Sequence, residues 1–183
     1  MDTLANLSFY AFCIVWVVGS FTLKRTRWTP PGPALLLHWS ILGVVIALFF
    51  PVGGFLGWRI LPDRRWLDDL SDAFHVIGFG FAIWARVHIG RNWSAGINLK
   101  QDHTLIRTGP YALVRHPIYS GLLLVVLGKA LGQGKVAGLL AFAILLIEWK
   151  RKSLIEERLM AETFGEEYER YRAEVKGLVP AVW

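Results

Sequence analysis

Two long stretches without charge constrain this chain more than any other feature. Residues Thr3 to Leu23 contain no Asp, Glu, Lys or Arg, and neither do residues Trp28 to Trp58. A helix needs about 20 apolar residues to cross the hydrocarbon core of a bilayer, and each stretch meets that length. Hydrophobic residues make up 54% of the 183-residue chain, and the mean hydropathy is +0.42, which is too apolar for an ordinary soluble domain. The sequence therefore predicts an all-α, multi-pass membrane protein.

Three further apolar segments are shorter or interrupted by charge. Asp72 and Arg86 shorten the uncharged centre of the first, although both side chains can snorkel toward an interface. The other two have an uncharged centre of 12 residues each, a length at which a re-entrant segment competes with a crossing. We expect spans over residues 70–89, 117–134 and 135–150, which brings the total to about five.

The last two of these segments are expected to form a tight helical hairpin. Gly128 and Gly132 share one face of the first arm, and Gly134 and Gly138 share one face of the second, so the two arms could approach closely. We treat residues 1–183 as a single domain. In it, residues 1–91 supply three spans, and residues 92–183 supply a loop, the hairpin and a tail.

Basic residues predict how the chain is oriented. With five crossings, 15 of the 20 Lys and Arg residues fall in the first loop, the third loop and the tail, when Arg86 and Lys150 at the adjoining span ends are counted with them. The positive-inside rule then places the third loop and the C-terminus in the cytoplasm and the N-terminus outside. This distribution explains the net charge of +6 without a nucleic-acid partner. In the tail, Gly165 is expected to cap a helix, and Tyr168 and Tyr171 lie on a short amphipathic helix that folds back over the third loop.

The third loop ends in a run of polar residues placed against an apolar helix. Pro117 suits a first helical turn, whose free N–H groups point toward the loop and favour an anion. His116 and Tyr119 add directional hydrogen-bonding groups, and Tyr111 adds an aromatic face. This pattern predicts a site for a zwitterionic ligand with a carboxylate and a flat ring.

Several charged residues have both a functional and a structural interpretation. Glu156 and Glu157 follow the last span closely and could accept from an amino group or a ribose, or could belong to a solvated helix face. Glu148 lies inside the last span, where an ionisable residue indicates function unless it snorkels. Arg86 and Arg91 flank the third span as topology determinants or as contacts to a substrate headgroup. Cys13 is the only cysteine and the histidines are scattered, so we expect no metal site.

These residues together resemble a known family. The motifs are Gly109-Pro-Tyr, Arg115-His-Pro-Ile-Tyr-x-Gly121, Glu156-Glu157-x-x-Met and Phe164-Gly-x-x-Tyr-x-x-Tyr171. They look like those of the isoprenylcysteine carboxyl methyltransferases and their phospholipid N-methyltransferase relatives, over residues 92–177. The resemblance implies an integral membrane enzyme that uses S-adenosylmethionine, enclosed by the last helices, the motif loop and the tail.

The resemblance also implies roles for individual residues. It places the cofactor against Asn98, His103, Thr104, Leu105, Ile106, Tyr111, His116, Pro117, Ile118, Tyr119 and Glu156. Lys152 stands where eukaryotic members have a substrate-contacting Arg, four residues before the first glutamate of the pair. Its neighbour Arg151 is the second candidate, and Glu157 is a candidate base. A lysine keeps the charge but lacks the bidentate fork of Arg for a carboxylate.

The expected reaction moves a methyl group to a lipophilic acceptor that enters from the bilayer, such as the carboxylate of a prenylated cysteine. Three alternatives stay open. One is N-methylation of a phospholipid amine, which would need a base such as Glu156, Glu157 or His116. Another is an NADPH-dependent membrane reductase of sterol type, whose motif usually has an acidic residue where this chain has Leu122. The last is a non-catalytic scaffold. The expected partners are the lipophilic acceptor and membrane lipids.

Overall fold

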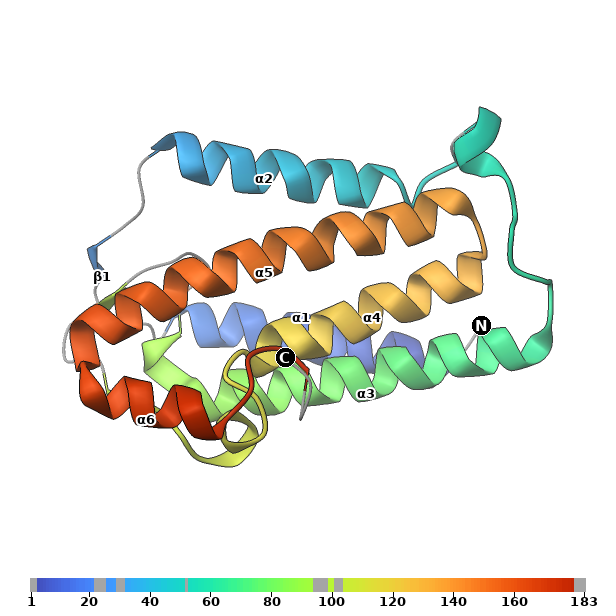
Figure 1. Cartoon of the computed structure of the whole chain (residues 1–183). Coiled ribbons are helices and arrows are strands. Elements are labelled where there is room, and N and C mark those ends of the chain that lie inside the picture. The colour runs from blue at the N-terminus through green and yellow to red at the C-terminus, as the bar shows by residue number, and fades with distance from the viewer. Residues whose placement is uncertain are drawn as a thin grey trace.

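Five long helices lie side by side in an elongated bundle (Figure 1). The computed structural model describes residues 3–21, 26–28, 32–51, 53–93, 99–100 and 104–179. The long helices are α1 (Thr3–Ser20), α2 (Gly32–Ala47), α3 (Arg65–Ile89), α4 (Pro117–Gln133) and α5 (Val136–Phe164), and a short α6 (Glu166–Glu174) follows. The predicted all-helical class is confirmed at this level.

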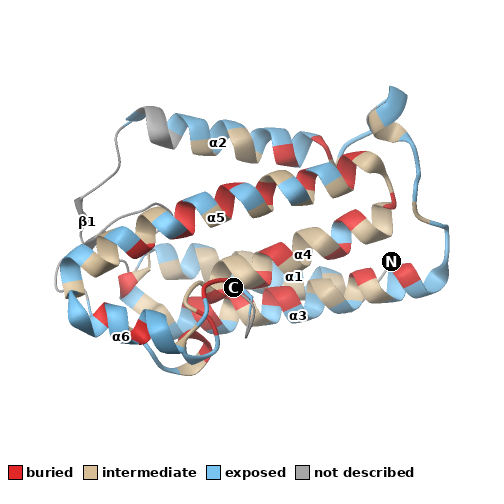
Figure 2. Ribbon diagram, in the orientation of Figure 1, coloured by how far each residue is buried: buried red, intermediate tan, exposed pale blue. Residues whose placement is uncertain are grey.

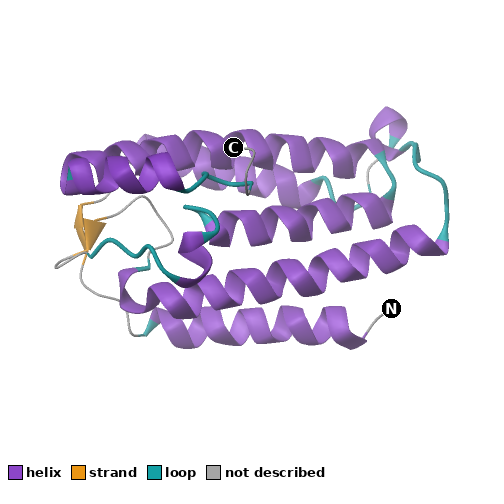
Figure 3. Cartoon of the chain, turned by 60° about the horizontal axis from the view of Figure 1, so that its bottom comes forward, coloured by secondary structure: helices purple, strands orange, loops and turns teal. Residues whose placement is uncertain are grey.

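Short elements connect these helices. Three 3₁₀ turns are present in the described residues: η1 (Gly54–Gly57), η2 (Gly90–Asn92) and η3 (Gly109–Ala112). Strand β1 (Thr26–Trp28) pairs antiparallel with β2 (Leu99–Lys100), a small ribbon that the sequence did not predict. The ribbon ties the first loop to the third loop at one end of the bundle (Figure 3).

The helix boundaries differ from the expected spans in two places. The second uncharged stretch is not one helix, because α2 ends at Ala47 and the chain then passes Pro51 and a left-handed Gly54, neither of which continues a helix. The last helix does not end near Lys150 but continues without a break to Phe164, where Gly165 at φ 54° caps it as predicted. The charged residues after Lys150 were expected to end the membrane span, but they do not end the helix.

Only the helix over Arg65–Asn92 is both long and apolar enough to cross a membrane, among the described residues. The apolar parts of three other helices, Leu4–Ser20, Leu36–Ala47 and Pro117–Gln133, are shorter. This reverses the expected order, in which the first two stretches were the strongest candidates and residues 70–89 were weaker. The count of five spans stays a prediction.

The outer faces of the bundle are nevertheless strongly apolar. The buried core between α2, α4 and α5 includes Val45, Leu123, Ala141 and Leu145. Little of α2 is buried otherwise (Figure 2), and its exposed large hydrophobic side chains are Leu36, Leu37, Trp39, Val44 and Ile46. An apolar face of this extent is unfavourable in water and favourable against lipid.

Glycines determine which helices approach most closely. A Cβ on Gly121 of α4 would lie 2.6 Å from the carbonyl oxygen of Gly78 on α3, and a Cβ on Gly78 would lie 2.5 Å from that of Gly121. The two backbones can touch only because neither residue has a side chain. Gly78 therefore has a packing role, at a position inside a helix.

The hairpin is as tight as predicted, but its glycine rows are arranged differently. Only two residues separate α4 from α5, and Gly134 adopts the left-handed conformation at the C-cap. Gly128 and Gly132 do not face the other arm, because both pack against Ser71 of α3. Gly138 does face the other arm, where a Cβ would meet Ala130 at 3.1 Å. The expected close contact between the two hairpin arms is thus confirmed for Gly138, but not for Gly128 and Gly132.

The first loop, the loop before α4 and the tail gather at the same end of the bundle (Figures 1 and 3). Five helices of alternating direction require this arrangement. The connection between α2 and α3 and the turn between α4 and α5 lie at the opposite end. Which end faces the cytoplasm stays a prediction.

Candidate functional site

The site is built where the third loop enters α4. His116 is the N-cap of α4, with φ −123° and ψ 60°, and Pro117 occupies the first helical position. Pro117 is fully buried, which holds this entry in place. The loop before it forms η3, in which Pro110 and Tyr111 are buried. The expected role of Pro117 as the start of the helix is confirmed.

Glu157 is the centre of a buried ion-pair network. Its side chain is 6% exposed, and one carboxylate oxygen accepts from Nη2 of Arg115 at 2.7 Å and from Nε at 3.2 Å. The same oxygen lies 3.1 Å from Nε2 of His116. Glu157 therefore holds two consecutive residues of the loop against α5.

Glu156 engages the other side of the same imidazole. Its carboxylate lies 3.4 Å from Nδ1 of His116 and accepts from the hydroxyl of Tyr119 at 2.6 Å. The rings of His116 and Tyr119 are nearly parallel, 5.6 Å apart, and Tyr119 stacks in turn on Trp149 at 5.3 Å. The imidazole thus lies between two carboxylates, with both nitrogens engaged.

This arrangement fixes the charges of the network. Burial alone would lower the pKa of His116, but the hydrogen bonds with Glu156 and Glu157 outweigh it and raise that pKa above its ordinary value. Burial would raise the pKa of Glu157, but its bonds with His116 and Arg115 lower that pKa to about 2. Glu157 is therefore ionised at neutral pH, and the two carboxylates favour the protonated form of His116.

The tail closes over this network. The backbone N–H groups of Arg115 and His116 donate to the carbonyl oxygens of Lys176 and Gly177 at 2.8 and 3.0 Å. The Ser120 hydroxyl donates to the carbonyl oxygen of Leu178 at 2.5 Å. The expected fold-back of the tail over the third loop is therefore what the structure shows.

Arg115 and Tyr171 add side-chain contacts between tail and loop. Arg115 also donates through Nη1 to the carbonyl oxygens of Arg172 and Val175. The hydroxyl of Tyr171 on α6 donates to the carbonyl oxygen of Tyr111 at 2.6 Å. Arg115 therefore links α5, the loop and the tail through one side chain.

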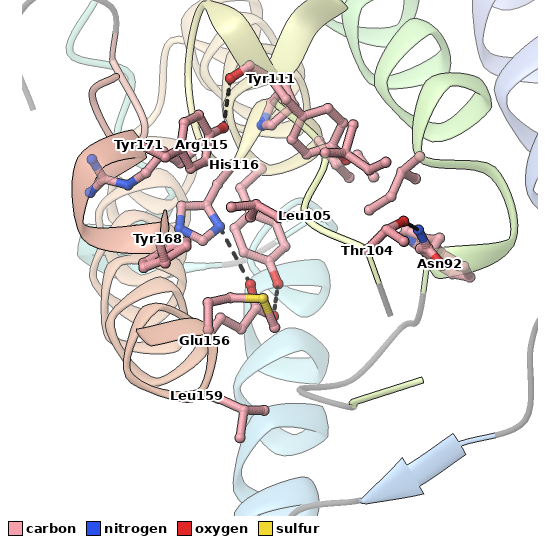
Figure 4. Close-up of a pocket in the computed structure, with 17 residues that line it drawn as sticks. Asn92, Thr104, Leu105, Tyr111, Arg115, His116, Glu156, Leu159, Tyr168 and Tyr171 are labelled. Atoms are coloured by element: carbon pink, nitrogen blue, oxygen red, sulfur yellow. Dashed lines mark hydrogen bonds and ion pairs between the residues drawn. The ribbon is translucent and has the colours of Figure 1, made fainter. Parts of the chain in front are cut away.

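A cavity of about 160 Å³ opens beside this network (Figure 4). The stretch Thr104 to Ile106, the loop from Tyr111 to Tyr119 and one face of α5 line it, and α6 covers it. Nine of the expected cofactor residues line it: Thr104, Leu105, Ile106, Tyr111, His116, Pro117, Ile118, Tyr119 and Glu156. Asn98 and His103 lie outside the described residues.

Eight lining residues were not among the expected contacts: Ile89, Asn92, Trp93, Arg115, Leu159, Met160, Tyr168 and Tyr171. Leu159 and Met160 follow Glu156 by three and four residues, a spacing that places them on the same helix face and could have identified them. Tyr168 and Tyr171 had been placed on the fold-back helix without a contact. Ile89, Asn92 and Trp93 carried no such signal.

The three expected catalytic residues do not line the cavity. Lys152 is 6% exposed, and its Nζ lies 5.2 Å from the ring centroid of Tyr119, behind the cavity wall. Arg151, next along the helix, points toward a different face, where it bonds Glu148 at 2.8 Å. Glu157 binds Arg115 and His116, and its expected role as a base stays a prediction.

Glu148 does not snorkel to the surface. It is 3% exposed and binds Nδ1 of His38 on α2 at 2.9 Å as well as Arg151. This triad ties α2 to α5. Among the described residues, no group of three His, Cys, Asp or Glu side chains is arranged to hold a metal ion.

Known proteins resemble this chain in sequence and in fold. The chain matches the family described as phospholipid methyltransferase over residues 70–167. It is 34% identical to a protein-S-isoprenylcysteine O-methyltransferase of Schizosaccharomyces pombe over 54% of this chain and 43% of that protein. It is 25% identical to protein-S-isoprenylcysteine O-methyltransferase B of Arabidopsis thaliana over 81% of this chain and 74% of that protein.

A solved structure of a eukaryotic intramembrane Ras methyltransferase, isoprenylcysteine carboxyl methyltransferase, has a similar fold. The TM-score is 0.62 at 21% identity, over 84% of this chain and 54% of that one. The chain spans less than half of the Schizosaccharomyces pombe relative and about half of the solved structure. Because the family match covers residues 70–167, more than half of the chain, this protein belongs to the phospholipid methyltransferase family.

Proposed function

We propose that this protein is a membrane-embedded methyltransferase that uses S-adenosylmethionine. Its acceptor is lipophilic, and we propose the carboxylate of a prenylated cysteine. The observation that carries the proposal is the cavity itself. A family motif supplies the His116, Tyr119 and Glu156 network of one wall, and α6 supplies the aromatic cover.

The residues around the cavity suit the donor. Glu156 and the side-chain oxygen of Asn92, which has no hydrogen-bond partner among the described residues, can accept from amino or hydroxyl groups. Tyr111 and Tyr168 offer aromatic faces, and Ile106 lies among apolar neighbours. When bound, S-adenosylmethionine supplies a methyl group on a positively charged sulfur, and a carboxylate oxygen forms the new C–O bond as the S–C bond breaks and its electron pair stays on sulfur.

The chain itself contributes position and exclusion of water. The docked tail covers the cavity through the hydrogen bonds of Arg115 and Tyr171, which keeps bulk water from the reacting groups. The Glu156 carboxylate places a negative charge near a cationic ligand. Displacement at an activated methyl group requires mainly such alignment of the two reactants.

The charge state of the network favours a carboxylate acceptor over an amine. An amine must lose a proton before it attacks, so it needs a base. His116 has both nitrogens engaged and a raised pKa, and the pKa of Glu157, at about 2, makes it a poor base. Glu156 already accepts from Tyr119 and His116. A carboxylate arrives ionised and requires none of them.

We further propose five membrane spans, with the third loop and the tail in the cytoplasm and the N-terminus outside. The gathering of both loops and the tail at one end supports this topology. Donor would then enter from the cytoplasm and acceptor from the bilayer.

Ligand binding tests the proposal directly. Detergent-solubilised protein is titrated with S-adenosylhomocysteine and with NADPH in a calorimeter. Binding of S-adenosylhomocysteine alone is expected. Binding of NADPH alone would favour a reductase, and binding of neither would favour a scaffold. Transfer of radiolabelled methyl to a farnesylated cysteine rather than to phosphatidylethanolamine then assigns the acceptor.

Two variants test the cavity wall. His116→Ala and Glu156→Ala are each expected to weaken S-adenosylhomocysteine binding at least several-fold while the protein stays folded, because each removes a polar group of the wall. Glu162→Ala is the matched control, since Glu162 is exposed on the same helix. Unchanged affinity in both variants would show that the cofactor lies elsewhere.

A further inference from the structure

His88 lies on the last turn of α3 and is not among the described residues that line the cavity. A basic side chain on a last turn is favoured by the helix dipole, and that structural role requires only that the side chain reach solvent. The imidazole of this exposed residue instead contacts three of the four residues from Thr108 to Tyr111. His88 therefore connects α3 to the third loop.

The first contact is with Thr108, the N-cap residue of η3. Nε2 of His88 and Oγ1 of Thr108 are hydrogen-bonded at 2.9 Å. A threonine at an N-cap ordinarily accepts from a backbone N–H of its own helix, but the Thr108 side chain makes no such bond. Its hydroxyl instead holds the start of η3 to α3.

The second contact is with Gly109, whose φ is +60°. A Cβ on Gly109 would lie 2.8 to 3.0 Å from three atoms of the His88 ring, namely Cε1, Nδ1 and Nε2. The imidazole thus occupies the space that a side chain at this position would need. Glycine also adopts the left-handed backbone without strain. Gly109 therefore serves both the turn and the contact with α3.

The third contact joins His88 to a residue of the cavity wall. The rings of His88 and Tyr111 lie 25° from parallel, with centroids 6.4 Å apart. Tyr111 lines the cavity and is 8% exposed. Its carbonyl oxygen accepts from the hydroxyl of Tyr171 at 2.6 Å (Figure 4). Tyr111 is thus held by α3 through its ring and by α6 through its backbone.

We propose that His88 is a positioning residue for the methyl transfer, which holds the ring of Tyr111 in the orientation that the donor requires. This inference rests on the proposed function, in which Tyr111 offers an aromatic face to S-adenosylmethionine. His88 touches neither donor nor acceptor in this scheme and acts through Thr108, Gly109 and Tyr111. A ring that is held in place before the ligand arrives loses less conformational freedom on binding, so loss of His88 should weaken donor binding.

The test measures binding of S-adenosylhomocysteine to the detergent-solubilised full chain by calorimetry. His88→Ala should raise the dissociation constant about three- to tenfold, the effect of losing one hydrogen bond and one ring contact. The binding stoichiometry should not change, because a merely structural role would reduce the fraction of protein that binds rather than the affinity of that fraction. Val87→Ala is the matched control, since Val87 is the adjacent residue of α3 and is 63% exposed.

A double-mutant cycle tests the route through Tyr111. Tyr111→Leu removes the aromatic ring, so His88→Ala should weaken binding little further in that background. Thr108→Val, which keeps the shape but loses the hydroxyl, should weaken binding about threefold, whereas Thr108→Ser, which keeps the hydroxyl, should bind as the native protein does. In methyl transfer, His88→Ala should raise the KM for the donor and leave kcat at saturating donor unchanged.

Three results would overturn the inference. Unchanged affinity in His88→Ala would do so, and so would an undiminished effect of His88→Ala in the Tyr111→Leu background. If His88→Ala does not fold, Thr108→Val carries the test, and native affinity in that variant would overturn the inference as well. Absence of S-adenosylhomocysteine binding to the native protein is a separate outcome, because it would overturn the proposed function and this inference with it.

Discussion

The buried ion pair of Glu157 gives the most quantitative prediction. Glu157 binds Arg115 and His116, and its pKa is about 2 against an ordinary value of 4.5. A difference of about 2.5 pH units at about 1.4 kcal/mol per unit corresponds to about 3 kcal/mol of stability at neutral pH. The Glu157→Gln variant should lose this amount, because it removes the charge that Arg115 and His116 share and leaves Arg115 without this carboxylate.

The sign of the effect also determines its pH dependence. A carboxyl group whose pKa is lowered by folding stabilises the protein above pH 4.5, and this contribution is lost as the pH falls through about 2. The free energy of unfolding of the native protein and that of Glu157→Gln should therefore differ by about 3 kcal/mol at pH 7, and by less than half of that at pH 3.

Unfolding of the detergent-solubilised protein measures this difference across the pH range. Glu162→Gln is the control, because Glu162 is exposed on the same helix and its removal should change stability little. If the gap between the native protein and Glu157→Gln is as large at pH 3 as at pH 7, then the charge of Glu157 is not its source, and the assigned network is wrong.

Three other predictions follow from local contacts. Gly121→Ala should destabilise the protein by about 1–3 kcal/mol, because its Cβ would meet the backbone of Gly78, whereas Gly80→Ala has open space and should be neutral in the same unfolding assay. Tyr171→Phe should cost about 1 kcal/mol and weaken S-adenosylhomocysteine binding, through loss of its bond to Tyr111, while Tyr168→Phe should leave stability unchanged. The charge on His116 stabilises the fold below pH 6.5, so the stability difference between the native protein and His116→Gln should shrink as the pH rises through the raised pKa; a constant difference would contradict this.

The sequence was most informative where neighbouring residues act together. Pro117, His116 and Tyr119 lie within one helical entry, so their spacing alone placed them at one wall. Glu156 and Glu157 show the limit of this reasoning, because adjacent residues on a helix point about 100° apart. One faces the cavity and the other faces the ion-pair network, and no pattern in the sequence says which.

Contacts between distant segments were beyond such reasoning. Trp93 joins the cavity wall because α3 ends at Gly90 with a sharp turn. The uncharged residues before and after Ala47 were expected to form one long helix, but α2 ends at Ala47. A lack of charge indicates that a segment prefers an apolar environment and does not show that its backbone is one continuous helix. Likewise, Gly128 faces α3 and not the hairpin partner, because a row of small residues does not identify the helix that packs on it.

At the loop end of the bundle, two arginines are paired with carboxylates, and a third, Arg86, is held by neutral groups. Arg115 is matched by Glu157, and Arg151 is matched by Glu148. Each of these pairs ties α5 to a neighbouring residue or segment, and each partner would be costly to bury alone. Arg86 differs, because its buried Nε and Nη2 have no acceptor among the described residues. The guanidinium fits only because Gly19 on α1 has no side chain, since a Cβ there would collide with it. Among the described residues, the carbonyl oxygen of Gly90 and the ring of Trp93 are what face this guanidinium, so its burial depends on these two neutral contacts.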